Sequence, residues 1–248
     1  MTARRPFPRM WQAVFALVLV TGCRLAPDAG TIRISLPSAA IKQEEGQDRP
    51  TVDVAIPVLG TPEGAKFSLT RDGQAVTFEA SPSATFPGMT ELVESGAPYS
   101  TRLAYAISAA FPGGATATSQ LTITLARTLL SFPTLAEPRN GATSVGTAPK
   151  FRWNTQGLAS ANLRLEVIPE SGPSHVLLMS RNQAEFDWRD PATSSVTGGV
   201  SIPRSLFSGV RATARVVAYS TPVERSDSTG NRTLVTEESR SKAITFTP

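Results

Sequence analysis

Residues 101–126 read Thr-Arg-Leu-Ala-Tyr-Ala-Ile-Ser-Ala-Ala-Phe, then Pro-Gly-Gly-Ala, then Thr-Ala-Thr-Ser-Gln-Leu-Thr-Ile-Thr-Leu-Ala. Alternate side chains in the first segment are apolar and share one face of an extended chain: Leu103, Tyr105, Ile107, Ala109 and Phe111. A period of two residues is the period of a β-strand. Pro112-Gly113-Gly114 turns the chain, and residues 116–126 return with a second apolar face. This stretch therefore predicts a β-hairpin with one buried face.

The same alternation precedes this hairpin. Residues 31–36, 52–58 and 67–69 each place apolar side chains on one face. Pro57 suggests a sheet edge or a strand end, because proline cannot donate to a sheet ladder. Arg71-Asp72-Gly73-Gln74 is typical of a hairpin turn, since Asp-Gly supplies the positive φ angles that a two-residue turn needs.

The second half of the chain has the same texture. Strands are expected within residues 151–153, 163–167, 176–179, 184–188, 214–219 and 243–246. No helical period of useful length interrupts them, and short strands with frequent turn signals are typical of a β-sandwich. We expect an all-β chain with two β-sandwiches in tandem, residues 31–128 and residues 129–248, with the boundary near residues 127–134.

Two segments of the second half resemble known domains. Residues 137–153 run from Glu137-Pro138 through a turn-rich segment to Trp153, and residues 206–219 end in Arg-Val-Val-Ala-Tyr. Both resemble fibronectin type III and related immunoglobulin-like domains of bacterial surface proteins. Ala212 stands where that family usually carries the tyrosine of its corner. The resemblance implies two immunoglobulin-like sandwiches, the second of them fibronectin type III-like.

The first 22 residues have the composition of an export signal. Arg4, Arg5 and Arg9 precede a short apolar core over residues 11–20. A core of about ten residues is too short to span a bilayer, which needs ~20. We therefore expect a cleaved signal peptide over residues 1–22. Arg4-Arg5-Pro6-Phe7 also resembles part of a twin-arginine signal, so the general and the twin-arginine export routes both stay open.

The signal ends in Val20-Thr21-Gly22-Cys23, which resembles the lipobox of bacterial lipoproteins. In that family the cysteine thiol receives a diacylglycerol and the chain is cut before the cysteine. The resemblance implies lipidation at Cys23, peptidase recognition through Val20, Thr21 and Gly22, and a lipidated tether over residues 23–30. Because Arg24 and not aspartate follows the cysteine, it also implies the outer rather than the inner membrane of a bacterial envelope. A plain secretory signal with an incidental cysteine is the alternative.

Charge and cysteine content exclude several partners. The whole chain has 24 Lys+Arg and 20 Asp+Glu, a net charge of +4. Loss of the three signal-peptide arginines leaves 21 basic and 20 acidic residues, a net charge of +1. The remaining arginines are scattered, so we expect no nucleic-acid partner. The single cysteine is Cys23, which leaves none for a disulfide or a thiolate metal ligand after lipidation.

No pattern marks a catalytic or metal site. His175 is the only histidine, and the sequence around it, Glu170-Ser171-Gly172-Pro173-Ser174, predicts an exposed hairpin loop rather than part of a catalytic triad. The acidic residues Glu44, Glu45, Asp48, Asp187 and Asp190 are explained as a solvated loop and a strand end. Gly113-Gly114 and Gly198-Gly199 are expected in turns. We expect no metal, no cofactor and no catalytic residue.

Two tryptophans have alternative roles. Trp153 shares a strand face with Phe151, which favours a place in the sandwich core. Trp188 could lie in the core or at the surface. Exposed tryptophans could instead form a platform on which sugar rings stack.

Three functions follow from these patterns. We expect a non-enzymatic lipoprotein of the cell envelope that acts as a binding or scaffolding module for an unidentified protein or glycan. A carbohydrate- or peptidoglycan-binding lipoprotein is the alternative. An envelope enzyme with an unmarked carboxylate pair is the third reading.

Overall fold

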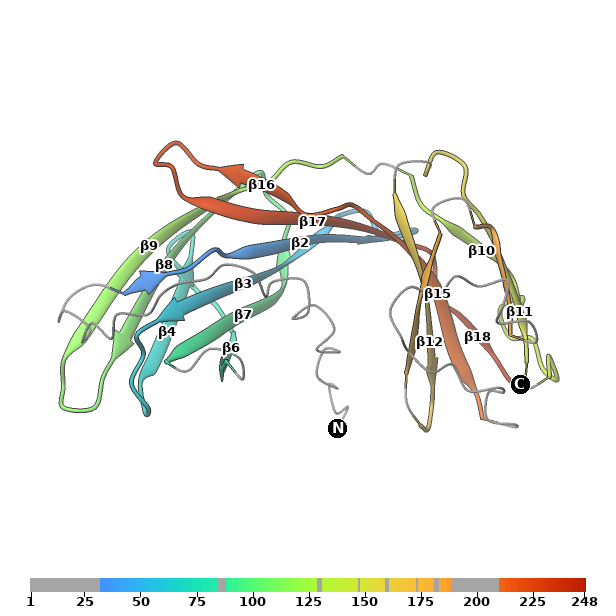
Figure 1. Ribbon diagram of the computed structural model, residues 1–248, viewed down its shortest axis with the longest axis horizontal. Coiled ribbons are helices and arrows are strands. Elements are labelled where there is room, and N and C mark those ends of the chain that lie inside the picture. Colours follow the sequence, from blue (N-terminus) through green and yellow to red (C-terminus); the bar gives the residue numbers. More distant parts are fainter. Residues whose placement is uncertain are drawn as a thin grey trace.

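The computed structural model describes residues 32–83, 88–128, 131–146, 148–158, 161–172, 174–180, 183–188 and 210–248. All regular secondary structure in these ranges is β-strand (Figure 1). None of these ranges contains a helix long and apolar enough to cross a membrane. The all-β class expected from the sequence is confirmed.

The first half of the chain, residues 32–128, forms nine strands among its described residues. They are β1 (Arg33–Ile34), β2 (Ser38–Glu44), β3 (Thr51–Leu59), β4 (Lys66–Arg71), β5 (Gln74–Ala75), β6 (Glu79–Pro82), β7 (Met89–Pro98), β8 (Arg102–Ala110) and β9 (Thr116–Thr124). One sheet has the order β5-β4-β8-β9, and β2, β3, β7 and β6 belong to a second sheet. The apolar faces of the two sheets enclose one hydrophobic core.

The hairpin predicted over residues 101–126 is confirmed. Strands β8 and β9 pair antiparallel from Arg102 opposite Thr124 to Ala110 opposite Thr116. The inward side chains of both strands, including Leu103 and Ile107, are buried in the first core. Alternation along the strands thus decides which face enters the core.

The turn between β4 and β5 is also as predicted. Asp72 and Gly73 both have positive φ, 51° and 79°, which is the geometry of a two-residue hairpin turn. Pro57, by contrast, lies within β3 and not at its end. It sits where the neighbour of β3 changes from β2, which pairs as far as Ala55, to β1, which begins opposite Val58. The missing N–H of proline is tolerated at this change of partner.

The second half, residues 131–248, forms a further nine strands among its described residues. They are β10 (Thr134–Glu137), β11 (Lys150–Asn154), β12 (Asn162–Pro169), β13 (His175–Met179), β14 (Glu185–Asp187), β15 (Ala212–Tyr219), β16 (Val223–Ser226), β17 (Arg232–Arg240) and β18 (Ile244–Phe246). A small sheet of order β10-β11-β14 packs against β12, β13, β15 and β18 around a second core. The β-sandwich packing expected from the sequence is confirmed in both halves.

Strands β16 and β17 form a hairpin that was not expected from the sequence, and we call it the arm (Val223–Arg240). It leaves the second half after β15, and β17 pairs in parallel with β2 over seven residue pairs, from Leu234 opposite Ser38 to Arg240 opposite Glu44. Only the end of β17 returns to β15, where Arg240 lies opposite Val217. The arm therefore joins both halves into one sheet of eleven strands among the described residues, whose main path is β13-β12-β15-β17-β2-β3-β7-β6.

The described residues form two hydrophobic cores. Buried apolar residues of the first core come from residues 32–125, and those of the second come from residues 135–246. Val235 of the arm is the exception, because it packs in the first core. The eleven-stranded sheet includes strands from both sides of residues 128/129. Its strand β17 belongs to the second half in sequence and lies between both halves in space. Separate folding of the two halves stays a prediction.

The molecule has the shape of an arch (Figure 1). Strands β2 and β17 cross it, β8 and β9 lie at one end, and β10 and β11 lie at the other. Each core lies between the eleven-stranded sheet and the smaller sheet at that end of the arch. The other face of the eleven-stranded sheet therefore faces the inside of the arch.

Candidate functional site

The residues proposed for lipidation and cleavage lie outside the described residues. These are Val20, Thr21, Gly22 and Cys23. The structure begins at Ile32, which is buried and donates its backbone N–H to the carbonyl of Thr118 at 3.4 Å. The described part of the chain thus begins beside β9.

Both tryptophans of the second half lie in its core. Trp153 is 4% exposed and Trp188 is 2% exposed. The ring of Trp188 packs edge-on against Phe186, with ring centroids 5.4 Å apart. The predicted core position of Trp153 is confirmed, and Trp188 joins it there. Neither ring can serve as a platform for sugar stacking.

The prediction that His175 lies in an exposed loop is wrong. His175 is the first residue of β13, is 8% exposed, and stands edge-on to Trp188 with ring centroids 5.8 Å apart. Burial lowers the pKa of its imidazole, so the ring is neutral at physiological pH. Strand β13 begins at the histidine itself, so His175 belongs to the sheet and not to the loop before it.

The acidic residues do not form a metal site. Asp187 lies at the end of β14, and Asp190 falls outside the described residues. Glu45 accepts the backbone N–H of Lys242 at 3.1 Å. In the described part of the chain no group of three or more histidine, cysteine, aspartate or glutamate side chains is placed to hold a metal ion.

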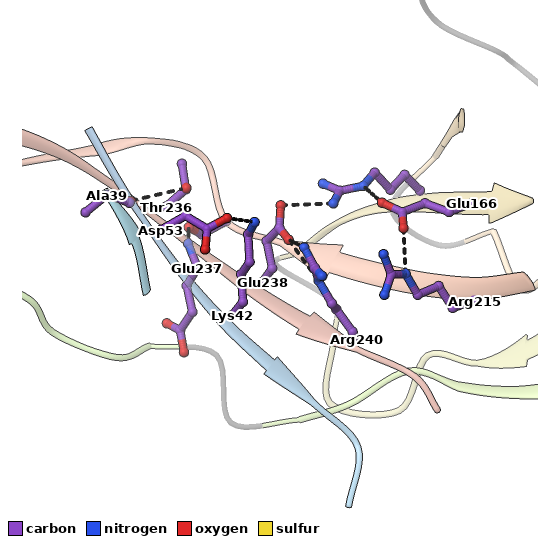
Figure 2. A network of polar contacts seen from close by, with 11 residues as sticks. Ala39, Lys42, Asp53, Glu166, Arg215, Thr236, Glu237, Glu238 and Arg240 are labelled. Atoms are coloured by element: carbon purple, nitrogen blue, oxygen red, sulfur yellow. Dashed lines mark hydrogen bonds and ion pairs between the residues drawn. The ribbon is translucent and has the colours of Figure 1, made fainter. Parts of the chain in front are cut away.

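The arm and its neighbours bring together a set of charged side chains that the sequence does not bring together. We call it the charged seam: Lys42, Asp53, Arg164, Glu166, Arg215, Glu238 and Arg240 (Figure 2). The strand register explains why they share one face. Arg164 of β12 lies opposite Val217 of β15, which lies opposite Arg240 of β17, and Glu238 lies opposite Lys42 of β2. The seam therefore crosses the inner face of the arch from one half to the other.

Arg164 is the centre of the seam in the second half. Its Nε donates to Glu166 at 2.7 Å and its Nη2 donates to Glu238 at 2.9 Å. Its guanidinium also lies over the ring of Tyr219, 5.4 Å from the centroid. Arg215 donates to the second oxygen of Glu166 at 2.6 Å. Two guanidinium groups thus share one carboxylate.

Glu238 connects the arm to β12. One of its oxygens accepts from Arg164, and the other accepts from Arg240 Nε at 3.1 Å. Its side chain is 1% exposed. On the neighbouring strands Lys42 pairs with Asp53, whose other oxygen accepts the backbone N–H of Gly96 at 2.9 Å.

The pKa values follow from this pairing. Burial alone would raise the pKa of Glu166, but the guanidinium groups of Arg164 and Arg215 outweigh it and lower the pKa to about 2. Burial likewise opposes the charge on Glu238, and Arg164 and Arg240 outweigh it and lower its pKa. Burial lowers the pKa of Lys42, and Asp53 only partly offsets that effect. The carboxylates of Glu166 and Glu238 are therefore ionised at neutral pH.

A second connection lies on the opposite face of β17. Glu237 is 3% exposed and accepts a hydrogen bond from Arg127 Nε at 3.2 Å and from Thr128 Oγ1 at 3.1 Å. The backbone N–H of Thr128 also donates to this carboxylate. The arm therefore holds the segment that leads from the first half to the second.

These contacts are typical of a structural connection between strands rather than of a catalytic centre. Its carboxylates and guanidinium groups are engaged with one another, and a general acid or base needs a group with access to substrate. A hollow with a volume of about 420 Å³ that opens to solvent is lined by residues of both halves. Its lining residues are Glu45, Gly46, Thr134, Leu135, Lys242 and Ile244.

No protein-family profile matches this chain, and no curated protein sequence matches it. Weak similarity to solved structures exists. Dimeric latent PorU from Porphyromonas gingivalis is 12% identical, with 89% of this chain and 20% of that chain covered and a TM-score of 0.31. A 1.5-MDa bacterial ice-binding adhesin is 13% identical, with coverages of 89% and 66% and a TM-score of 0.26. Protocadherin gammaB7 is 11% identical, with coverages of 84% and 51% and a TM-score of 0.21.

This chain thus spans about a fifth of the PorU chain and half to two thirds of the other two. TM-scores this low carry no conclusion about function.

Proposed function

We propose that this chain is a lipid-anchored module of the bacterial cell envelope that binds or scaffolds another envelope molecule and catalyses no reaction. The observation that carries the proposal is the continuous sheet through the arm. Seven residue pairs join β17 to β2. The ion pair between Arg164 and Glu238 joins β17 to β12, and the ion pair between Arg127 and Glu237 joins the arm to the first half. A sheet with paired strands on both sides of a joint resists bending, so the two halves hold their loops at a fixed spacing.

A fixed spacing between the two halves is useful to a module that presents binding surfaces. It has no obvious use in a chain whose domains move independently. The partner is an unidentified protein or glycan. The two tryptophans that a glycan-stacking surface would use are in the core, so neither of them favours the glycan alternative. Nucleic acid is not expected as a partner, because the seam pairs its basic groups with acidic ones.

The anchor is proposed at Cys23, on the outer membrane, after cleavage of residues 1–22. The test is fractionation of cells that express the full chain or its Cys23→Ala variant, with Ser108→Ala, an exposed change in β8, as a matched control. Wild type and Ser108→Ala should sediment with the outer membrane, and Cys23→Ala should not. Equal membrane content for all three would refute the anchor.

Binding is tested separately, in the native envelope. A photo-crosslinking side chain at an exposed loop position of either half should capture the same discrete partner in repeated experiments. A partner captured by Cys23→Ala as well would show that the binding surface works without the anchor. Turnover of an envelope substrate by the purified chain would refute the non-enzymatic assignment.

A further inference from the structure

The two ends of the first sandwich differ in charge. One end includes residues 59–65 and residues 111–115, and we call these residues the tether end. These twelve residues include a single charged side chain, Glu63. The opposite end includes residues 45–50, 71–74 and 98–101, and five of those fourteen residues are charged: Glu45, Asp48, Arg49, Arg71 and Asp72.

The strand register places the two loops of the tether end side by side. Lys66, at the start of β4, lies opposite Ala110, at the end of β8, and the loops before and after these residues are neighbours. Gly64 lies against the ring of Pro112. Leu59, at the end of β3, is 38% exposed and is among the few large apolar side chains exposed in the described ranges. Figure 1 shows these loops at the free end of the arch.

The tether reaches the fold at this same end. Ile32 bonds to Thr118 near the start of β9, and Arg33 lies opposite Leu59. Ile32 lies nine positions after Cys23 in the chain. An extended chain spans at most ~3.6 Å per residue, so the attachment point lies within about 32 Å of the acylated cysteine.

The opposite end of the first sandwich is poorly placed to face the membrane. A nine-residue strand such as β8 is about 30 Å long, so the tether would have to run fully extended along the whole sandwich to let that end touch the membrane. That end also abuts the second half, where Glu45 accepts the backbone N–H of Lys242. Charged loops, moreover, lose hydration when they enter the interface of a bilayer.

We propose that the tether end is a membrane-contact surface, which lies against the lipid bilayer and directs the rest of the arch away from it. The partner of this surface is a lipid bilayer, contacted through weakly polar loops and exposed Leu59 rather than through basic side chains. The proposal rests on the proposed lipid anchor at Cys23. It adds an orientation, because an anchor alone would leave the arch free to tumble about its tether.

The single cysteine of the chain makes a direct test possible. Once Cys23 carries its thioether-linked lipid, a cysteine introduced elsewhere is the only free thiol. Ala115→Cys places that thiol on the tether end, and Gln47→Cys places it at the opposite end of the same sandwich. Both positions are exposed and lie in turns, so neither change disturbs a core.

The lipidated full-length variants are labelled with an environment-sensitive fluorophore and reconstituted into vesicles of phosphatidylethanolamine and phosphatidylglycerol. Headgroup spin-labelled lipid should quench the label at residue 115 several-fold more than the label at residue 47. Equal quenching, or stronger quenching at residue 47, would overturn the orientation.

A separate readout distinguishes failure of the anchor from failure of the orientation. Mass spectrometry of the N-terminal peptide and flotation with the vesicles report lipidation for each variant. Variants that do not float and carry no acyl mass would refute the anchor and the contact surface together. Variants that float and show equal quenching would refute the contact surface alone.

Discussion

Replacement of Glu238 by glutamine should destabilise the whole arch. The substitution keeps the shape of the side chain and removes its charge. Glu238 is 2% exposed and accepts from both Arg164 and Arg240, so the variant leaves one buried and one partly buried guanidinium group without their shared anion. Arg164 keeps Glu166, which limits the damage on that side.

Loss of one partner from a buried ion pair typically costs about 3–5 kcal/mol. For a domain of this size, 1 kcal/mol corresponds to about 2–4 °C in Tm. We therefore expect a fall in Tm of roughly 6–20 °C, measured by circular dichroism, together with a lower urea midpoint.

Glu224→Gln is the matched control. It is the same substitution in the same arm, but Glu224 and its partner Arg232 have side chains that are 45% and 63% exposed. An exposed ion pair contributes about 0–1 kcal/mol, so the control should melt close to wild type. If Glu238→Gln and Glu224→Gln melted at the same temperature, the seam would not hold the arch together and the reasoning would be wrong.

Further predictions concern pH, the core and the arm. The pKa of Glu166 is lowered from 4.5 to about 2 in the folded chain, so its ion pairs stabilise fully above pH 4.5, and this stability is lost as the pH falls toward 2. Urea unfolding should therefore show a gap between wild type and Glu166→Gln at pH 6 that narrows by pH 3, and a constant gap would contradict the assignment. Trp153→Ala removes a ring that is 4% exposed and should cost ~3–5 kcal/mol, while Leu59→Ala, at an exposed position, should change the melting temperature little; a normal melt for Trp153→Ala would contradict its core role. Residues 30–128 and 130–248 should each unfold cooperatively when expressed apart. The two fragments should also bind each other in calorimetry through the β2–β17 ladder, and loss of that binding with Val235→Asp would identify the arm as the contact.

The hairpin over residues 101–126 could be predicted from sequence because a strand buried on one face has apolar side chains at every second position. Leu103, Tyr105 and Ile107 alternate with small or polar residues, and the same pattern identified β12 and β15. The turn at Asp72-Gly73 could be predicted because few residues accept positive φ. The signal peptide and the proposed anchor at Cys23 belong to the sequence alone.

The arm was missed for the opposite reason. Strand β17 reads Arg-Thr-Leu-Val-Thr-Glu-Glu-Ser-Arg, and both of its faces are polar although residues 235–239 are buried. A strand that is buried by pairing on both sides and by ion pairs carries no apolar alternation, so periodicity does not reveal it. The Asp227–Asn231 turn, in which Asp227 accepts from the N–H groups of Thr229 and Asn231, was the one local signal of a hairpin.

His175 shows the same limit at a single position. Its neighbours in sequence are turn residues, and only the packing of β13 against Trp188 places the ring inside the second core.

The sequence by itself determined the strands, the turns and the way each half buries one face, because these depend on residues a few positions apart. Only the tertiary structure decided that Glu238 would meet Arg164, 74 residues away in the chain, and that β17 would pair with β2. Such contacts depend on which strands become neighbours once the arm packs beside β2 and β15. Ion pairs between neighbouring strands stabilise these contacts. The sequence around a carboxylate does not indicate which guanidinium group will pair with it.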